Sequence, residues 1–138
     1  MSEENVEIMR AYVEAYNAGA EAFGDFLVDF MAEDVEIVPD ASHFPEAKPF
    51  RGREEYRRYI ANNDQDWEGG GRSEIKEIFP VRDDRVVVRV DWGGRGRASG
   101  IDLRSSLSAI TTVRDGQITK FEFFFDHAQA LEAAGLLE

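Results

Sequence analysis

The run from Ser105 to Phe125 constrains the fold of this chain more than any other stretch. It predicts a strand over Ser105–Val113, a tight turn at Arg114-Asp115-Gly116 and a returning strand over Gln117–Phe125. Asp-Gly between two runs of β-branched and aromatic residues is a strong hairpin signal, because glycine adopts the positive φ that such a turn needs. The C-terminal third of the chain therefore predicts an antiparallel pair of strands.

The return strand of this hairpin predicts an aromatic wall. Phe121, Phe123 and Phe125 recur at every second position, so their rings share one face of the sheet. A face of this kind must be covered by other parts of the chain. We expect helices from the N-terminal half to cover it incompletely, so that the gap forms a pocket for a small molecule.

The rest of the chain predicts helices first and strands later. The C-terminal helix is expected to be short, and Pro39–Arg51, which holds three of the four prolines, reads as a loop that forms a lid or rim. This order predicts an α+β fold in which helices cover one face of an antiparallel sheet of about five strands. The predicted helices are Glu3–Asn17, Ala20–Met31, Gly52–Asn63 and His127–Ala134, and the further strands are Val35–Val38, Ser73–Phe79, Arg85–Trp92 and an extension of the hairpin strand back to Ala98.

Composition excludes several classes of function. The formal net charge is −12, and nucleic-acid binding needs clustered Lys and Arg, so neither nucleic acid nor an acidic membrane is an expected partner. The chain has no cysteine, and its two histidines are far apart without a local acidic cluster, so no metal or other cofactor is predicted. No apolar run approaches the ~20 residues of a membrane span. Together with an acidic N-terminus unlike a signal peptide, this predicts a single cytoplasmic domain over residues 1–138.

Six short motifs are spread over nearly the whole chain. They are Glu33-Asp34-Val35-Glu36, Phe50-Arg51-Gly52-Arg53-Glu54, Asp84-Arg85-Val86-Val87-Val88, Gly94-Arg95-Gly96, Thr112-Val113-Arg114-Asp115-Gly116 and Ala130-Leu131-Glu132-Ala133-Ala134-Gly135-Leu136. Together they resemble the SnoaL-like polyketide-cyclase group of the nuclear-transport-factor-2-like superfamily. The resemblance implies a cone-like fold, in which a bent sheet wraps around three helices. It does not assign a chemistry, because the motifs mark the fold and not a reaction.

The superfamily includes cyclases, a ketosteroid isomerase, an epoxide hydrolase and binding domains without known activity. The isomerase type uses a tyrosine on the first helix, a carboxylate base after the first strand and a carboxylic acid on the penultimate strand. Tyr12 falls at or beside the tyrosine position. The base position falls near Pro39, one residue from Asp40, and Ala109 stands near the acid position, where it cannot transfer a proton. Two of the three positions therefore fail.

Arg89 and Asp91 are the candidate catalytic residues, because they interrupt a run of valines that otherwise reads as buried. They resemble the Arg-x-Asp motif of the epoxide-hydrolase type, although Phe123 stands where that type has its second aspartate. If the pair lines the pocket, Asp91 would act as a base or hydrogen-bond acceptor and Arg89 would bind a carbonyl or carboxylate. The alternative places both on the outer face of the sheet as an ion pair of little energetic value.

These observations predict a domain that binds a hydrophobic small molecule in an apolar pocket between the aromatic wall and the first and third helices. If the domain is catalytic, the reaction would be cofactor-free acid–base chemistry of cyclase, isomerase or hydrolase type. The sequence leaves open whether any reaction occurs. The predicted pocket residues are Tyr12, Tyr16, His43, Tyr56, Tyr59, Trp67, Leu107, Ala109, Phe121, Phe123 and Phe125.

The alternative function is a non-catalytic module whose cavity is filled by its own side chains. The resemblance implies a homodimer through the sheet, whose penultimate strand would present Arg104, Ser106, Ser108 and Ile110 on its outer face. A cavity of roughly 300–1,000 Å³ with Arg89 or Asp91 on its wall would favour the binding domain. A solid interior with both charges turned outward would favour the module.

Overall fold

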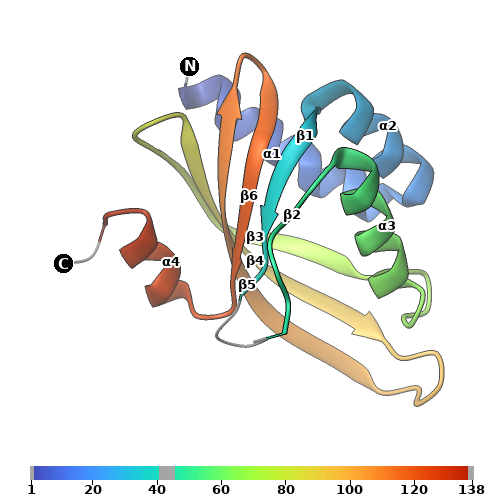
Figure 1. Cartoon of the computed structure of the whole chain (residues 1–138). Helices are drawn as coiled ribbons and strands as arrows, with labels where there is room; N and C mark the ends of the chain where they lie inside the picture. The colour runs from blue at the N-terminus through green and yellow to red at the C-terminus, as the bar shows by residue number, and fades with distance from the viewer. Residues whose placement is uncertain (1, 41–45, 137–138) are drawn as a thin grey trace.

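A computed structural model describes residues 2–40 and 46–136 of the chain. Six strands of this part form one sheet, in the order β2-β1-β6-β5-β4-β3. The predicted α+β class, with a bent sheet and a short C-terminal helix, is confirmed. The elements, labelled in Figure 1, are α1 (Ser2–Ala18), α2 (Ala20–Phe30), β1 (Met31–Val38), β2 (Phe50–Arg51), α3 (Arg53–Asp64), β3 (Arg72–Val81), β4 (Arg85–Arg95), β5 (Asp102–Arg114), β6 (Gln117–Phe124) and α4 (His127–Ala133).

The β5–β6 hairpin forms as the sequence predicts. Asp115 and Gly116 have φ values of 51° and 78°, as a two-residue turn between right-twisted strands requires. β5 begins at Asp102 rather than at Ala98. The reason is a turn before it, in which the backbone N–H of Gly100 donates to the carbonyl of Gly96 at 2.9 Å.

The N-terminal strand joins the sheet in a way that sequence patterns do not show. β1 pairs with β6 in parallel, with Ile37 opposite Phe121, while the other strand pairs are antiparallel. The short strand β2 lies within the predicted loop and pairs with β1, through Arg51 opposite Glu36. This arrangement brings the segment that follows β1 to the end of the aromatic wall on β6.

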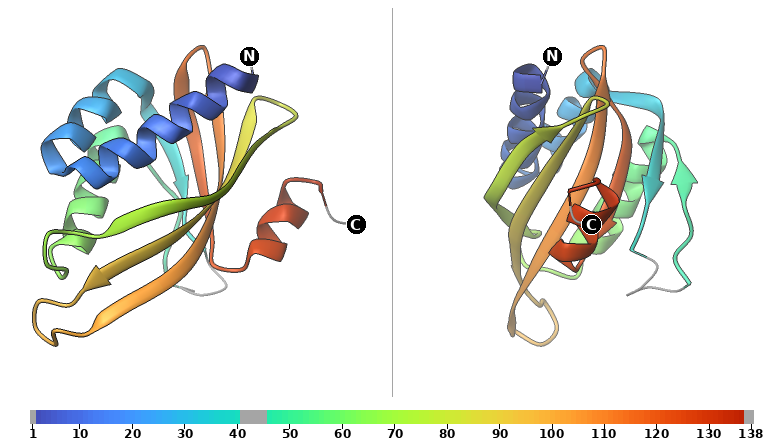
Figure 2. Two further views of the ribbon diagram at one scale, coloured as in Figure 1. Left: turned by 180° about the vertical axis from the view of Figure 1, so that it is seen from behind. Right: turned by 90° about the vertical axis from the view of Figure 1, so that its left-hand side faces the viewer.

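The helices lie on both sides of the sheet. α1, α2 and α3 cover its concave face, and α4 packs alone against the opposite face (Figures 1 and 2). Beneath α4 a small cluster contains Val87, Ile110 and Ala134. None of the helices in the described ranges has both the length and the apolar character that a membrane crossing requires. The main core, between the three helices and the sheet, includes Val6, Met9, Val13, Phe23, Phe26, Leu27, Met31, Val35, Ile37, Tyr56, Val86, Val88 and Ile118.

Candidate ligand-binding site

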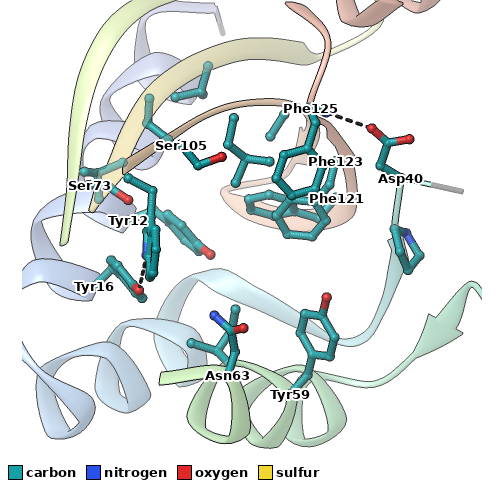
Figure 3. Close-up of a pocket in the computed structure, with 18 of the residues that line it drawn as sticks. Tyr12, Tyr16, Asp40, Tyr59, Asn63, Ser73, Ser105, Phe121, Phe123 and Phe125 are labelled. Carbon is teal, nitrogen blue, oxygen red and sulfur yellow. Dashed lines mark hydrogen bonds between the residues drawn. The ribbon is translucent and has the colours of Figure 1, made fainter. Parts of the chain in front are cut away.

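A cavity of about 360 Å³ lies between the concave face of the sheet and helices α1 and α3 (Figure 3). Its volume falls within the range of small-molecule sites, roughly 300–1,000 Å³. Side chains from α1, α3, β4, β5 and β6 line it, together with the segment after β1. The lining residues are Met9, Tyr12, Val13, Tyr16, Pro39, Asp40, Tyr56, Tyr59, Ile60, Asn63, Trp67, Ser73, Val88, Val90, Trp92, Leu103, Ser105, Leu107, Ala109, Phe121, Phe123 and Phe125.

The predicted aromatic wall forms one side of this cavity. The rings of Phe121 and Phe123 stack with their centroids 4.6 Å apart, and Phe125 follows them along the same face (Figure 3). Tyr56 of α3 stacks on Phe121 with ring centroids 5.8 Å apart. The ring centroid of Tyr12 of α1 lies 5.3 Å from that of Phe121. The helices thus touch the wall near Phe121 and leave a hollow beside it.

Two tyrosine hydroxyls meet at the cavity, from helices that lie far apart in sequence. The hydroxyl of Tyr12 on α1 forms a hydrogen bond with that of Tyr56 on α3. Burial raises the pKa of both phenols well above the ordinary value, so both stay protonated at neutral pH. One hydroxyl donates to the other, which leaves the second hydrogen of the pair without an acceptor among the described residues.

A second network closes one end of the cavity. The indole N–H of Trp92 on β4 donates to the Tyr16 hydroxyl at 2.9 Å, and that hydroxyl donates to Asp64 Oδ1 at 2.9 Å. Burial raises the pKa of Asp64, although the hydrogen bond from Tyr16 partly opposes this effect. Trp67 meets Trp92 edge to face, with ring centroids 5.0 Å apart. This chain of contacts ties α1, α3 and β4 together.

Asp40 is the carboxylate on the cavity wall, at the end of the aromatic face. Its side chain is buried, and its Oδ2 accepts the backbone N–H of Phe125 at 2.7 Å (Figure 3). The family resemblance put the base position near Pro39, one residue from Asp40, so Asp40 was not among the predicted pocket residues. Asn63 and Ser105 were also missed. Ser105 lies two residues before Leu107 on β5, so strand alternation alone could have identified it.

Arg89 and Asp91 do not lie in the cavity, which corrects the catalytic assignment made from the sequence. Their neighbours Val88, Val90 and Trp92 line the cavity, so strand alternation turns the two charges to the opposite face. Asp91 Oδ2 lies 3.7 Å from Lys76 Nζ, with both side chains about 40% exposed. The Nε of Arg89 is buried and has no hydrogen-bond partner in the described part of the chain.

The outer face of β5 is also less open than the sequence suggested. Ile110 is buried beneath α4, and Ser108 is only 2% exposed. The Ser108 hydroxyl forms a 2.7 Å hydrogen bond with Nδ1 of His127, whose Nε2 lies 3.1 Å from Glu77 Oε1. These contacts hold the first turn of α4 against the sheet. Arg104 and Ser106 remain exposed, as predicted.

Most residues of the predicted pocket come together in the structure. His43 lies outside the described residues, and His127 is on the outer face of the sheet. No three His, Cys, Asp or Glu side chains converge on a possible metal position within residues 2–40 and 46–136. Whether the cavity residues bind a ligand stays a prediction. The predicted residues that line the cavity are Tyr12, Tyr16, Tyr56, Tyr59, Trp67, Leu107, Ala109, Phe121, Phe123 and Phe125.

Comparison with known proteins supplies the family. The model of the SnoaL-like domain matches residues 9–121. The chain belongs to the SnoaL-like domain family. The resemblance inferred from the sequence motifs is thereby confirmed, whereas no curated protein matches the chain.

Solved structures similar to this SnoaL-like domain share its fold at low sequence identity. A candidate SnoaL-like polyketide cyclase from Jannaschia sp. CCS1 is 17% identical with a TM-score of 0.76, and the match covers 99% of this chain and 95% of that one. TerC, co-crystallised with polyporic acid, is 23% identical with a TM-score of 0.70 and coverages of 96% and 98%. A protein with a ketosteroid isomerase-like fold from Catenulispora acidiphila DSM 44928, in complex with trimethylamine, is 21% identical, with a TM-score of 0.70 and coverages of 95% and 94%.

The chemistry available in this SnoaL-like domain follows from the groups on the cavity wall. Aromatic and aliphatic side chains make up most of it, which suits a flat apolar body. The hydroxyls of Tyr12 and Tyr56 offer a neutral hydrogen-bond donor, and the Asp40 carboxylate offers an acceptor. Because Arg89 and Asp91 face the other way, neither can touch a molecule in the cavity.

Proposed function

We propose that this SnoaL-like domain binds a flat, hydrophobic small molecule that carries a hydrogen-bond acceptor. The observation that supports this most directly is the aromatic cavity with a buried pair of tyrosine hydroxyls. A cavity filled by its own side chains, as the alternative function requires, would not leave about 360 Å³ of space. The aromatic wall supports the planar shape of the ligand, and the Tyr12–Tyr56 pair supports its hydrogen-bond acceptor.

The wall favours a planar ligand. Phe121 and Phe123 are nearly parallel, with 29° between their planes, and Tyr56 lies within about 30° of both. A flat ring system placed beside them can continue this stack, since aromatic rings prefer offset-stacked or edge-to-face packing. The valines of β4 and Leu107 of β5 supply the apolar surface around it.

The tyrosine pair favours an acceptor on that ligand. The hydrogen that Tyr12 and Tyr56 do not use between themselves would donate to a carbonyl or ether oxygen of the ligand. Satisfying a buried hydroxyl in this way is worth about 0.5–1.5 kcal/mol. Polyporic acid in TerC and trimethylamine in the Catenulispora protein support the view that small molecules can occupy this fold.

If the bound molecule reacts, the acid–base step would fall to Asp40. It is the carboxylate among the described lining residues, so it would take a proton from carbon while a tyrosine hydroxyl holds the carbonyl oxygen on which charge develops. The proton would then return to another carbon of the same molecule, without a cofactor. Asp40→Asn should retain ligand binding and lose any turnover.

Tryptophan fluorescence can test the binding proposal directly. Both tryptophans of the chain, Trp67 and Trp92, line the cavity. Titration with menadione, a planar quinone, should quench them saturably. Ser105→Leu places a larger side chain in the cavity and should weaken binding about tenfold, which corresponds to about 1.4 kcal/mol. Gln117→Leu is the control, since this exposed residue at the start of β6 is not among the lining residues of the cavity. Linear, unsaturable quenching, or equal affinity for both variants and the parent, would refute the proposal.

We also propose that the uncovered part of the outer sheet face forms a homodimer. The Nε of Arg89 is buried and has no hydrogen-bond partner among the described residues, in a chain with 28 acidic and 16 basic residues. Glu77 of β3 stands opposite Arg89, and the next cross-strand pair, Glu74 and Asp91, lies on the same face with Lys76 and Arg104. A two-fold axis through this mixed patch would bring Arg89 to a carboxylate of the second copy, which would give its guanidinium a partner.

Sedimentation of Arg89→Met tests this dimer. The parent chain should sediment as a dimer and Arg89→Met predominantly as a monomer. Arg82→Met, in the exposed turn between β3 and β4, is the control and should remain dimeric. A monomeric parent chain at micromolar concentration, or a dimer that Arg89→Met leaves intact, would exclude this interface.

A further inference from the structure

We infer that the cavity selects its ligands by charge: it admits neutral and cationic planar molecules and discriminates against anions. This inference rests on the proposed function, because it specifies the class of ligand for the same site. It is drawn from three independent features of the wall, namely its ionisable groups, its neutral donors and its aromatic rings.

The first feature is the set of ionisable groups. Among the described lining residues there is no Lys, Arg or His, although the chain contains 16 Lys and Arg in total. The charged lining residue is Asp40, whose buried carboxylate stands at the end of the phenylalanine wall. An anionic ligand would lose its hydration on entering and would meet no opposite charge among the described lining residues. Desolvating an ion that finds no opposite charge is unfavourable.

The second feature is the chemistry of the other polar groups, which are neutral. Figure 3 shows Tyr59 and Asn63 rising from α3 on one side of the cavity, and Ser105 on the opposite side. With the Tyr12–Tyr56 pair, these side chains can form hydrogen bonds with a carbonyl, hydroxyl or amine. They satisfy polar atoms of a neutral molecule, but they do not neutralise a carboxylate.

The third feature is the aromatic lining itself. The wall includes four tyrosines, both tryptophans and three phenylalanines, and the faces of such rings carry partial negative charge. Rings of this kind attract ammonium groups and repel anions placed over their faces. The tyrosines show the same preference, since burial raises the pKa of Tyr12, Tyr16, Tyr56 and Tyr59 and so disfavours negative charge at each position.

A set of three ligands with one ring system tests the inference. Naphthylmethanol is neutral, naphthylmethylamine is cationic and naphthoate is anionic at pH 7. Calorimetric titration should show binding of the alcohol and the amine, with naphthoate at least about tenfold weaker than the alcohol, a difference of about 1.4 kcal/mol. Equal affinity of naphthoate and the alcohol would overturn the charge selection and leave the proposed binding function standing. If none of the three binds, the proposed function itself fails, and the selection with it.

A charge placed in the cavity gives a second, independent readout. Ser105→Lys puts an ammonium group on the wall and should raise the affinity for naphthoate relative to naphthylmethanol by about tenfold. Gln117→Lys adds the same charge at an exposed position at the start of β6, outside the cavity lining, and controls for the change in net charge. If both lysine variants change the ratio equally, the discrimination arises from the overall charge of the protein, and the inference is wrong. Circular dichroism of each variant verifies that the fold is retained.

Discussion

The indole ring of Trp92 packs directly on the backbone of Gly71. A Cβ at position 71 would lie 2.1 Å from Nε1 and 2.4 Å from Cε2 of that ring, far inside contact distance. The chain at this point has no space for any side chain. Because the same Nε1 donates to Tyr16, the bare backbone of Gly71 determines where one end of the cavity is closed.

Gly71→Ala is therefore expected to displace Trp92 and break its hydrogen bond to Tyr16. Overpacking of this kind costs about 1–3 kcal/mol. Urea unfolding followed by tryptophan fluorescence measures both the loss of stability and the change in the environment of the indole. Gly93→Ala is the control, since its added Cβ would meet only ordinary contacts, at 3.6 Å or more. Equal stability of the two variants would show that Trp92 does not depend on this contact.

Tyr16→Phe should destabilise the chain more than Tyr59→Phe. The first change removes the acceptor of the Trp92 N–H and one of the donors to Asp64, and leaving the half-buried indole N–H unpaired costs up to about 1–3 kcal/mol. Tyr59 has no hydrogen-bond partner within the described ranges and is 45% exposed. Chemical denaturation of both variants measures the difference in the free energy of unfolding. Equal effects would mean that the Tyr16 network contributes nothing to stability.

The buried tyrosines Tyr12 and Tyr56 should ionise only as the chain unfolds. Burial raises the pKa of Tyr12 and Tyr56 above the ordinary 10.0, so the neutral phenols contribute stability below about pH 10. That contribution is lost as the pH rises through the folded-state pKa. Absorbance at the phenolate band, recorded together with circular dichroism, should show ionisation and unfolding in one transition. The guanidinium-unfolded chain should ionise near the ordinary value. Ionisation of all four tyrosines near pH 10 in a folded chain would contradict the burial.

Asp64 should make the stability fall as the pH rises from acid to neutral. Its folded-state pKa lies above the ordinary 3.8, so the folded chain binds this proton more tightly than the unfolded chain. The resulting stabilisation is present below pH 3.8 and disappears as the pH rises through the folded-state pKa. Asp64→Asn cannot ionise and retains an oxygen that accepts from Tyr16. The stability of the parent minus that of the variant should therefore decrease with rising pH; an increase would reverse the assigned sign.

Local patterns were enough to predict the hairpin, the aromatic wall and part of the cavity lining. Alternation along one strand is a local property, so Phe121, Phe123 and Phe125 could be placed on one face before any tertiary contact was known. The orientation of Arg89 and Asp91 was left open, because alternation alone does not say which set of side chains faces the helices. The position of Val88 and Val90 on the cavity wall decides it.

Long-range pairing accounts for what the sequence did not show. Asp40 belongs to the site because β1 runs parallel to β6, and a parallel neighbour leaves no turn signature in the sequence. The position of α4 likewise depends on contacts between residues far apart in sequence. His127 reaches both Ser108 and Glu77, residues 19 and 50 positions away, and so fixes a short helix on the outer face.

The parallel pairing of β1 with β6 also sets an order of assembly. Ile37 and Phe121 stand opposite each other although 84 positions separate them, so this long loop must close before β1 can pair with β6. During synthesis, the first two helices and β1 leave the ribosome long before the strand on which they dock. Until that strand arrives, their apolar faces stay exposed, and an N-terminal fragment without Gln117–Phe124 should aggregate rather than fold.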